Sequence, residues 1–211
     1  LGKDFVTTSF YGSHIITAMG GGGMVMSDDK EMIDRLRTMR DWGRGVDVSE
    51  DITDRYKFQM GDIPYDGKFW YTERGFNMRP VEAQAAFGLE QLKRLDEFTK
   101  KRKENFHKLY EFFAQYPYFN LPKSQYDPNW LAFPMTIKDA PFTRFDLVEY
   151  FEKQGIQTRP IFSGNVLRHP AFQIRSPEGF PGADYVMKYG ILLGIHQGMN
   201  DEQIEYIKQT F

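Results

Sequence analysis

The stretch Ser9-Phe10-Tyr11-Gly12-Ser13-His14 is followed by four consecutive glycines at residues 20–23. Residues 5–11 and 24–26 favour β-strands, so the glycines predict a sharp turn between two strands. A serine hydroxyl and glycine-rich backbone amides can hold a phosphate, and an imidazole fixed by a tight turn can move protons near neutral pH. The spacing alone also fits a plain glycine hairpin with a half-buried histidine.

Helices are predicted on the C-terminal side of this turn. Asp28 and Glu31 have the spacing of a capping box, so a helix is expected to begin there and to end near Trp42. Residues 43–79 show no periodicity and are rich in Gly, Asp, Pro and aromatics, which predicts a long loop of functional character.

Apolar residues then recur at helical spacing over residues 80–117, which predicts one long helix or two in line. The basic run Lys100-Lys101-Arg102-Lys103 in its middle is interpreted as a solvated helix face, because no aromatic or Gly-rich context accompanies it. Further elements are predicted at 132–138 (strand), 143–154 (helix, with the cap pair Thr143 and Asp146), 156–162 (strand), 183–189 (helix), 191–195 (strand) and from Asn200, with Gln203, onward (helix). Strands that alternate with helices indicate an α/β fold.

The composition excludes several classes of function. Lys plus Arg is 27 and Asp plus Glu is 29, a formal net charge of -2, which argues against nucleic acid or an anionic membrane as the main partner. The sequence contains no cysteine, so disulfides and thiolate-bound zinc or iron–sulfur centres are excluded for this chain, and we expect no metal site. No apolar run approaches the length of a membrane span, and we expect a soluble, cytoplasmic protein.

Residues 9–25 resemble the cofactor-lysine segment of the DegT-like nucleotide-sugar aminotransferases, whose pattern is Ser, four residues, Lys and a Gly-rich turn. The resemblance implies a PLP-dependent transferase fold (aspartate aminotransferase-like, fold type I). It also implies a partial large domain over residues 1–105 and a small C-terminal α/β domain over residues 106–211. Matching blocks follow in order: Arg40-Asp41-Trp42-Gly43-Arg44, Arg74-Gly75-Phe76-Asn77-Met78-Arg79, Glu82-Ala83-Gln84-Ala85-Ala86-Phe87-Gly88 and Gly155-Ile156-Gln157-Thr158-Arg159.

His14 occupies the lysine position of this pattern. That replacement is similar to one branch of the family, the NDP-4-keto-6-deoxyhexose 3-dehydratases of the colitose and ascarylose type, and the block Ser163-Gly164-Asn165-Val166-Leu167-Arg168-His169-Pro170 resembles the same branch. The branch uses pyridoxamine 5'-phosphate, the amine form of pyridoxal 5'-phosphate. It condenses with the C4 ketone of a nucleotide-linked 4-keto-6-deoxy sugar, and the C3 hydroxyl leaves. The resemblance implies that His14 is the catalytic base; a structural histidine in an inactive relative is the alternative.

The resemblance also implies roles for other residues. Ser9 would bind the cofactor phosphate, unless its hydroxyl is bonded to its own turn. Asn77 would reach the phosphate of the partner subunit's site, which implies a homodimer with shared active sites; an N-cap role before Pro80 is the alternative. Residues that could reach the nucleotide-sugar, where guanidinium groups suit a pyrophosphate, are Arg44, Arg159, Asn165, Arg168 and His169.

The chain departs from the ascarylose-type enzyme, which binds an iron–sulfur cluster through cysteines in and after the segment that corresponds to residues 44–56. Without those cysteines no cluster is expected, and the colitose-type route, with glutamate as amino donor, is the better analogy. Family chains also carry the first half of the large domain upstream of the Ser9 position. We therefore expect the C-terminal part of such an enzyme. A nucleotide-sugar aminotransferase relative and a truncated, non-catalytic dimerisation module are the alternatives.

Overall fold

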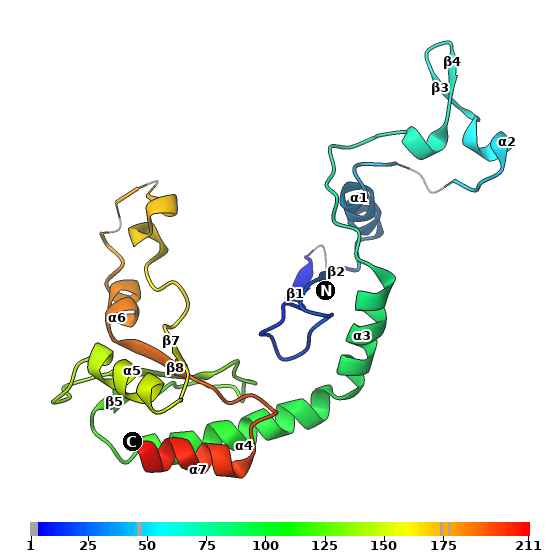
Figure 1. The fold of residues 1–211 in the computed structure, drawn as a ribbon. Helices are drawn as coiled ribbons and strands as arrows, with labels where there is room; N and C mark the ends of the chain where they lie inside the picture. Colours follow the sequence, from blue (N-terminus) through cyan, green and yellow to red (C-terminus); the bar gives the residue numbers. More distant parts are fainter. Residues whose placement is uncertain (1–3, 46–47, 174, 177) are drawn as a thin grey trace. The chain divides into compact units, whose positions relative to one another are not determined.

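The computed structural model describes residues 4–45, 48–173, 175–176 and 178–211 (Figure 1). The chain divides into two units, Leu1–Lys93 and Arg94–Phe211. The domain boundary expected after residue 105 falls inside helix α4 (Leu95–Phe113) and stays a prediction.

The predicted glycine hairpin is confirmed. Strands β1 (Val6–Ser9) and β2 (Gly23–Met26) pair antiparallel, and Ser9 lies opposite Gly23. A Cβ atom on Gly23 would come 2.9 Å from the Thr8 carbonyl oxygen. Gly20 and Gly22 have φ of 89° and 92°, a conformation that side chains disfavour, so the glycines meet both a steric and a conformational demand of the turn.

Helix α1 (Lys30–Arg40) follows, with its cap one residue later than predicted. The N-cap is Asp29 and not Asp28: Asp29 has extended backbone angles, and its carboxylate accepts the Met32 N–H at 3.0 Å. The Asp29 N–H is itself bonded to the Ser27 hydroxyl at 3.1 Å, which fixes Asp29 at the cap position.

The segment expected to be a long loop contains short elements instead. Asp51 and Asp66 cap two of them with their side chains. These elements are α2 (Ile52–Arg55), β3 (Phe58–Met60), β4 (Ile63–Tyr65) and the 3₁₀ turn η1 (Gly67–Phe69). β3 and β4 form an antiparallel hairpin, and the ring of Phe58 packs on that of Trp70 with 5.7 Å between centroids. Elements of three or four residues are too short to show a hydrophobic period, which is why the sequence pattern missed them.

Residues 4–93 bury almost no apolar side chains of their own. Helix α3 (Glu82–Lys93) has no buried residue, and Ala18 is the one buried hydrophobic residue in the described part of this unit. Exposed large apolar side chains include Phe5, Met24, Met26, Phe76, Phe87, Leu89 and Leu92. With many large apolar side chains exposed and almost none buried, the described part of this unit does not form a hydrophobic core of its own.

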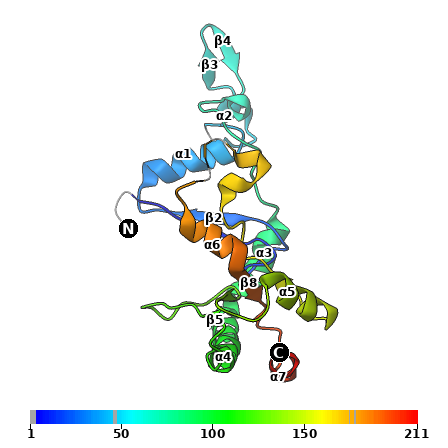
Figure 2. The same ribbon diagram turned by 90° about the vertical axis from the view of Figure 1, so that its left-hand side faces the viewer.

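The second unit contains a sheet in which every neighbouring pair is antiparallel. Its strand order is β5 (Phe119–Asn120), β6 (Phe133–Ile137), β8 (Gly190–Leu193) and β7 (Thr158–Arg159). The surrounding helices are α4, α5 (Arg144–Lys153), α6 (Pro181–Tyr189) and α7 (Asp201–Thr210), with 3₁₀ turns η2 (Val166–Arg168) and η3 (Pro170–Phe172). Figures 1 and 2 both show α7 alongside α4. The fully buried side chains between the helices and the sheet include Leu109, Phe113, Phe133, Phe151, Ile191, Leu193 and Ile204.

The predicted strand–helix–strand order around α5 is found, with a difference in pairing. β6 and β7 are not neighbours, because β8 lies between them and pairs with both. β7 is also shorter than predicted. Phe162 and Gly164 have φ of 47° and 59°, so the chain turns away from the sheet soon after Arg159.

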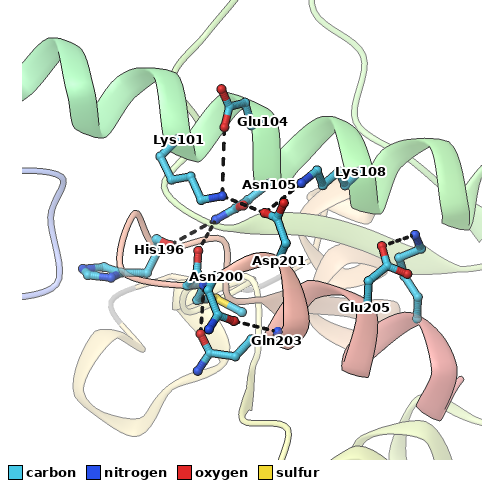
Figure 3. A network of polar contacts seen from close by, with 11 residues as sticks. Lys101, Glu104, Asn105, Lys108, His196, Asn200, Asp201, Gln203 and Glu205 are labelled. Carbon is cyan, nitrogen blue, oxygen red and sulfur yellow. Dashed lines mark hydrogen bonds and ion pairs between the residues drawn. The ribbon is translucent and has the colours of Figure 1, made fainter.

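Predicted helix caps in this unit are confirmed at Thr143 and Asn200, each of which forms a complete capping box. Of the two alternatives predicted for residues 80–117, two helices are found, α3 and α4, and they are separated at Arg94. The carboxylate of Asp201, at the start of α7, forms ion pairs with two lysines of α4, Lys101 and Lys108 (Figure 3). Each Nζ lies 2.8 Å from Oδ1.

The interpretation of the basic run as a solvated helix face is wrong for Arg102, which is 1% exposed. Its Nε donates to the Gln197 side chain at 2.7 Å, and its Nη1 donates to the carbonyl oxygens of Trp130 at 3.3 Å and Leu131 at 2.8 Å. Burial lowers the pKa of this guanidinium. Lys100, in the same run, is exposed as expected.

Across the described residues, no helix combines the length and the apolar character needed to cross a membrane.

Candidate functional site

His14 lies in the loop that joins β1 to β2. Its backbone N–H donates to the Tyr11 carbonyl at 2.9 Å, which closes a tight turn, and its ring contacts the Tyr11 ring edge-on at 6.0 Å. The imidazole Nδ1 is 3.1 Å from the Ser9 carbonyl oxygen. Because a carbonyl can only accept, Nδ1 carries the proton in this contact, and in the neutral ring Nε2 is then the basic nitrogen.

Ser9 is the last residue of β1 and is exposed. Its Oγ accepts the Tyr11 N–H at 3.2 Å. The hydroxyl is therefore bonded to its own turn, as the alternative interpretation of Ser9 predicted. The same hydroxyl still has its own proton to donate, so this contact does not prevent Ser9 from binding an anion.

The rest of the loop is tied by contacts to Phe10. The Phe10 N–H donates to the Gly22 carbonyl at 3.0 Å, and the Phe10 carbonyl accepts the Ala18 N–H at 3.2 Å. The Thr17 hydroxyl donates to the same carbonyl at 2.8 Å and accepts the Gly20 N–H at 2.9 Å. The sequence analysis assigned no role to Thr17. Its place between His14 and the glycines at 20–23 could have identified it as a residue that ties the loop together.

Two of the sequence blocks meet in space. Trp42 N–H donates to the Phe76 carbonyl at 3.0 Å, and Phe76 N–H donates to the Met39 carbonyl at 2.7 Å. Asp41 and Asn77 form an antiparallel bridge in the same contact. The side chain of Asn77 is exposed. The N-cap alternative for Asn77 is wrong, because α3 begins only at Glu82.

Arg44 lies between two aromatic rings. Its guanidinium carbon is 5.1 Å from the centre of the Trp42 ring and 5.7 Å from that of Phe69, a cation–π arrangement on both rings. Its Nε is buried and has no hydrogen-bond partner within the described residues. Trp42 has φ of 57°, a strained conformation for this residue type. The arrangement holds a charged group in place with part of its hydrogen-bonding capacity unused.

Arg159 lies in β7, opposite Leu192 of β8, and is exposed. Its Nη1 donates to the Thr158 carbonyl at 2.7 Å, which leaves the other guanidinium donors of the fork available. The neighbouring Glu152 carboxylate accepts the N–H and the hydroxyl of Thr158, and these bonds lower the pKa of Glu152.

Asn165, Arg168 and His169 are brought together in one loop, but each has a partner in the protein. Asn165 is buried, and its amide donates to Asp184 at 2.8 Å. Arg168 forms a bidentate ion pair with the same carboxylate: Nε lies 2.5 Å from Oδ1 and Nη2 lies 2.7 Å from Oδ2. These two contacts lower the pKa of Asp184 to about 2. The His169 Nε2 is 2.9 Å from the Ser163 carbonyl oxygen. The sequence did not point to Asp184, the centre of this cluster.

Among the described residues, no group of three or more His, Asp or Glu side chains is arranged to hold a metal ion. His196 follows β8, and its Nδ1 accepts the Gly198 N–H at 3.0 Å, a contact that stabilises the turn after the strand. Burial and the nearby Arg102 charge lower the pKa of His196.

The sequence of the whole chain, residues 1–211, matches the model of the family described as DegT/DnrJ/EryC1/StrS aminotransferases. It is 34% identical to dTDP-4-dehydro-2,6-dideoxy-D-glucose 3-dehydratase of Saccharopolyspora spinosa, over 98% of this chain and 47% of that protein. The chain spans about half the length of the curated relatives it matches.

Solved structures give the same result. The GDP-4-keto-6-deoxy-D-mannose-3-dehydratase of E. coli with bound hydrated PLP superposes with a TM-score of 0.81 and 29% identity, over 100% of this chain and 55% of that one. A GDP-4-keto-6-deoxymannose-3-dehydratase with a trapped PLP-glutamate geminal diamine superposes with a TM-score of 0.82 and 28% identity, over 100% of this chain and 55% of that one.

Proposed function

The chain belongs to the DegT/DnrJ/EryC1/StrS aminotransferase family, and we propose that it is the C-terminal part of a pyridoxamine-phosphate-dependent nucleotide-sugar 3-dehydratase. The observation that carries the proposal is the residue at position 14. A histidine stands where transamination in this fold needs a lysine, and it is held by a hydrogen bond that leaves Nε2 as the basic nitrogen.

The cofactor, when bound, supplies the amine that condenses with the sugar ketone and the ring that takes up electrons. The residues on this chain fit part of that group. The Ser9 hydroxyl retains a donor for the phosphate, and the exposed Asn77 amide would supply another to the partner subunit's phosphate. A partner for the pyridine nitrogen is not among the residues assigned to this site, so the cofactor would be held jointly with residues outside this set.

His14 would act as the general base. Its Nε2 would accept the proton from the C4′ carbon of the cofactor, and the same nitrogen, now protonated, could assist the departure of the C3 hydroxyl. A lysine in this position would be captured by the aldehyde form of the cofactor. An imidazole forms no such stable adduct and remains free to transfer protons.

The five proposed substrate-side residues fall into two groups. Arg44 and Arg159 keep unused donors, and a guanidinium fork suits the pyrophosphate of a nucleotide-sugar. Asn165, Arg168 and His169 are engaged with Asp184 and Ser163. They would contribute to the substrate side by fixing the loop that they share, or by exchanging these partners when substrate binds.

The net reaction balances with glutamate as the reductant. Replacement of the C3 hydroxyl by hydrogen reduces the sugar by two electrons. The same two electrons come from the conversion of glutamate to 2-oxoglutarate and ammonia. The dehydratase structure that holds a PLP-glutamate adduct supports this choice of amino donor. We further propose a cytoplasmic homodimer with shared active sites: the family resemblance gives Asn77 the phosphate of the partner subunit's site, and its exposed side chain is compatible with that role.

An absorbance titration of the complete gene product tests the proposal. Pyridoxamine phosphate and pyridoxal phosphate are added separately, and borohydride follows. The proposal expects saturable binding, no covalent trapping at residue 14, and, with glutamate and a GDP- or dTDP-linked 4-keto-6-deoxy sugar, a 3-deoxy product with one 2-oxoglutarate per turnover. An amino sugar as the product would overturn it in favour of an aminotransferase. Absence of cofactor binding by the complete protein would also overturn it.

A further inference from the structure

Thr17 connects the two sides of the loop that carries His14. Its hydroxyl donates to the Phe10 carbonyl at 2.8 Å and accepts the Gly20 N–H at 2.9 Å, so both hydrogen-bonding functions of one side chain are used across the loop. The residue is half-buried, which shields these bonds from competition by water. Neither contact involves a group that the proposed reaction uses directly.

The bonds to Phe10 fix the two peptide groups on either side of that residue. The peptide group between Ser9 and Phe10 is held through its N–H, which donates to the Gly22 carbonyl at 3.0 Å. The peptide group between Phe10 and Tyr11 is held through its carbonyl, which receives the Thr17 hydroxyl and the Ala18 N–H. The Ser9 carbonyl belongs to the first of these peptide groups, so the Phe10–Gly22 bond sets its direction. The Thr17 and Ala18 bonds hold the next peptide group and so restrict the rotation about Phe10 that would let the Ser9 carbonyl turn away.

The Ser9 carbonyl is the group that meets the His14 imidazole, at 3.1 Å from Nδ1. A carbonyl at this nitrogen selects the Nδ1–H tautomer, whereas free histidine has no neighbour that makes this choice. If the carbonyl turned away, the ring would lose both its orientation and the hydrogen bond that keeps the proton on Nδ1.

We propose that Thr17 is a positioning residue for His14: through the Phe10 carbonyl it holds the Ser9 carbonyl against Nδ1, and so keeps Nε2 as the unprotonated nitrogen. The catalytic consequence rests on the proposed dehydratase function. The tautomer of His14 does not, because it is a property of the loop itself.

Two variants of the complete gene product separate the hydroxyl from the shape of the side chain. Thr17→Val keeps the branched shape and loses both hydrogen bonds, and Thr17→Ser keeps the hydroxyl. The first measurement is NMR of protein with ¹⁵N-labelled histidine, without cofactor. The sequence has 4 histidines, and His14→Asn identifies the signal. We expect the Nδ1–H form in the parent and in Thr17→Ser, and a mixture of tautomers in Thr17→Val.

The second measurement is turnover. Since catalytic groups moved by about 1 Å lose on the order of 100-fold in rate, we expect Thr17→Val to lower kcat about 10- to 100-fold with little change in KM, and Thr17→Ser to restore most of it. A parent protein with His14 in the Nε2–H form overturns the proposal even if Thr17→Val fails to fold. Unchanged tautomer and kcat in a folded Thr17→Val also overturn it. A parent that shows the Nδ1–H form but no dehydratase turnover refutes the proposed function and leaves the positioning result standing.

Discussion

Gly75 lies directly against Gly43: a Cβ atom built on Gly75 would come 2.2 Å from the Gly43 backbone nitrogen. The two glycines belong to separate sequence blocks, and their contact allows the backbone of residues 39–42 to bond to that of residues 76–78. This contact places Arg44 and Asn77, two proposed site residues, on neighbouring segments of one unit.

The contact predicts that Gly75→Ala will displace one block from the other. Gly75 does not have a positive φ, so any loss comes from the clash and not from backbone strain. We expect a loss of several kcal/mol in unfolding free energy, in the range of severe overpacking, together with weaker binding of the nucleotide-sugar. Gly182→Ala is the matched control, because a Cβ atom there meets nothing within 4 Å. Thermal unfolding and substrate titration of both variants would decide; equal behaviour contradicts the prediction.

Replacement of His14 should separate binding from chemistry. His14→Asn keeps a polar side chain of similar size but has no basic nitrogen, and removal of a general base typically costs about 10²- to 10⁴-fold in rate. We expect kcat to fall by that factor while pyridoxamine phosphate still binds. His14→Lys is the converse change, and borohydride should then fix pyridoxal phosphate covalently to residue 14, as mass spectrometry of the peptide would show. Normal turnover of His14→Asn would refute the assignment.

Arg102 should matter more for stability than the exposed Lys100 of the same basic run. Arg102→Met would remove the donor to the backbone carbonyls of Trp130 and Leu131 and one bond to the Gln197 side chain, and an unsatisfied buried group costs about 1–3 kcal/mol. We expect a loss of about 2–3 kcal/mol in denaturant unfolding, with an upward shift of the His196 pKa as a second sign, because the Arg102 charge helps to lower that pKa. Lys100→Met removes an exposed charge from the same helix and should change stability by less than about 0.5 kcal/mol.

The ion pairs between α4 and α7 predict a component of acid sensitivity. Hydrogen bonds from Lys101 and then Lys108 lower the pKa of Asp201 to about 2, from an ordinary value of 3.8. The folded-state pKa is depressed, so this stabilisation is complete above pH 4 and is lost as the pH falls from about 4 to about 2. Asp201→Asn should flatten the stability curve in that window. Asp139→Asn, an exposed loop residue, makes the same chemical change and should leave the slope as it is.

Local patterns in the sequence predicted the local structure well. The glycines at 20–23 predicted the hairpin, and Thr143 with Asp146 predicted the start of α5, because turns and caps depend on residues that are neighbours in sequence. The family resemblance is confirmed as well, and with it the fold class, since whole blocks such as residues 40–44 and 74–79 carry information that propensity does not.

Contacts between distant residues could not be predicted in this way. Arg102 was interpreted as solvated because its burial depends on Gln197, 95 positions away. Asp184 had no motif to identify it, since its partners Asn165 and Arg168 lie in another segment. The roles of the site residues stay predictions.

The distribution of buried side chains has a consequence for how the site is maintained. In the described residues, every buried hydrophobic side chain except Ala18 comes from positions 98 and beyond. The C-terminal unit therefore has the buried core that a cooperative folding unit requires. The unit that carries His14 has no such core in its described part and would depend on surfaces from outside it for its stability. The proposed activity is then tied to assembly: loss of the covering surface would unfold the histidine loop while the C-terminal core stayed folded.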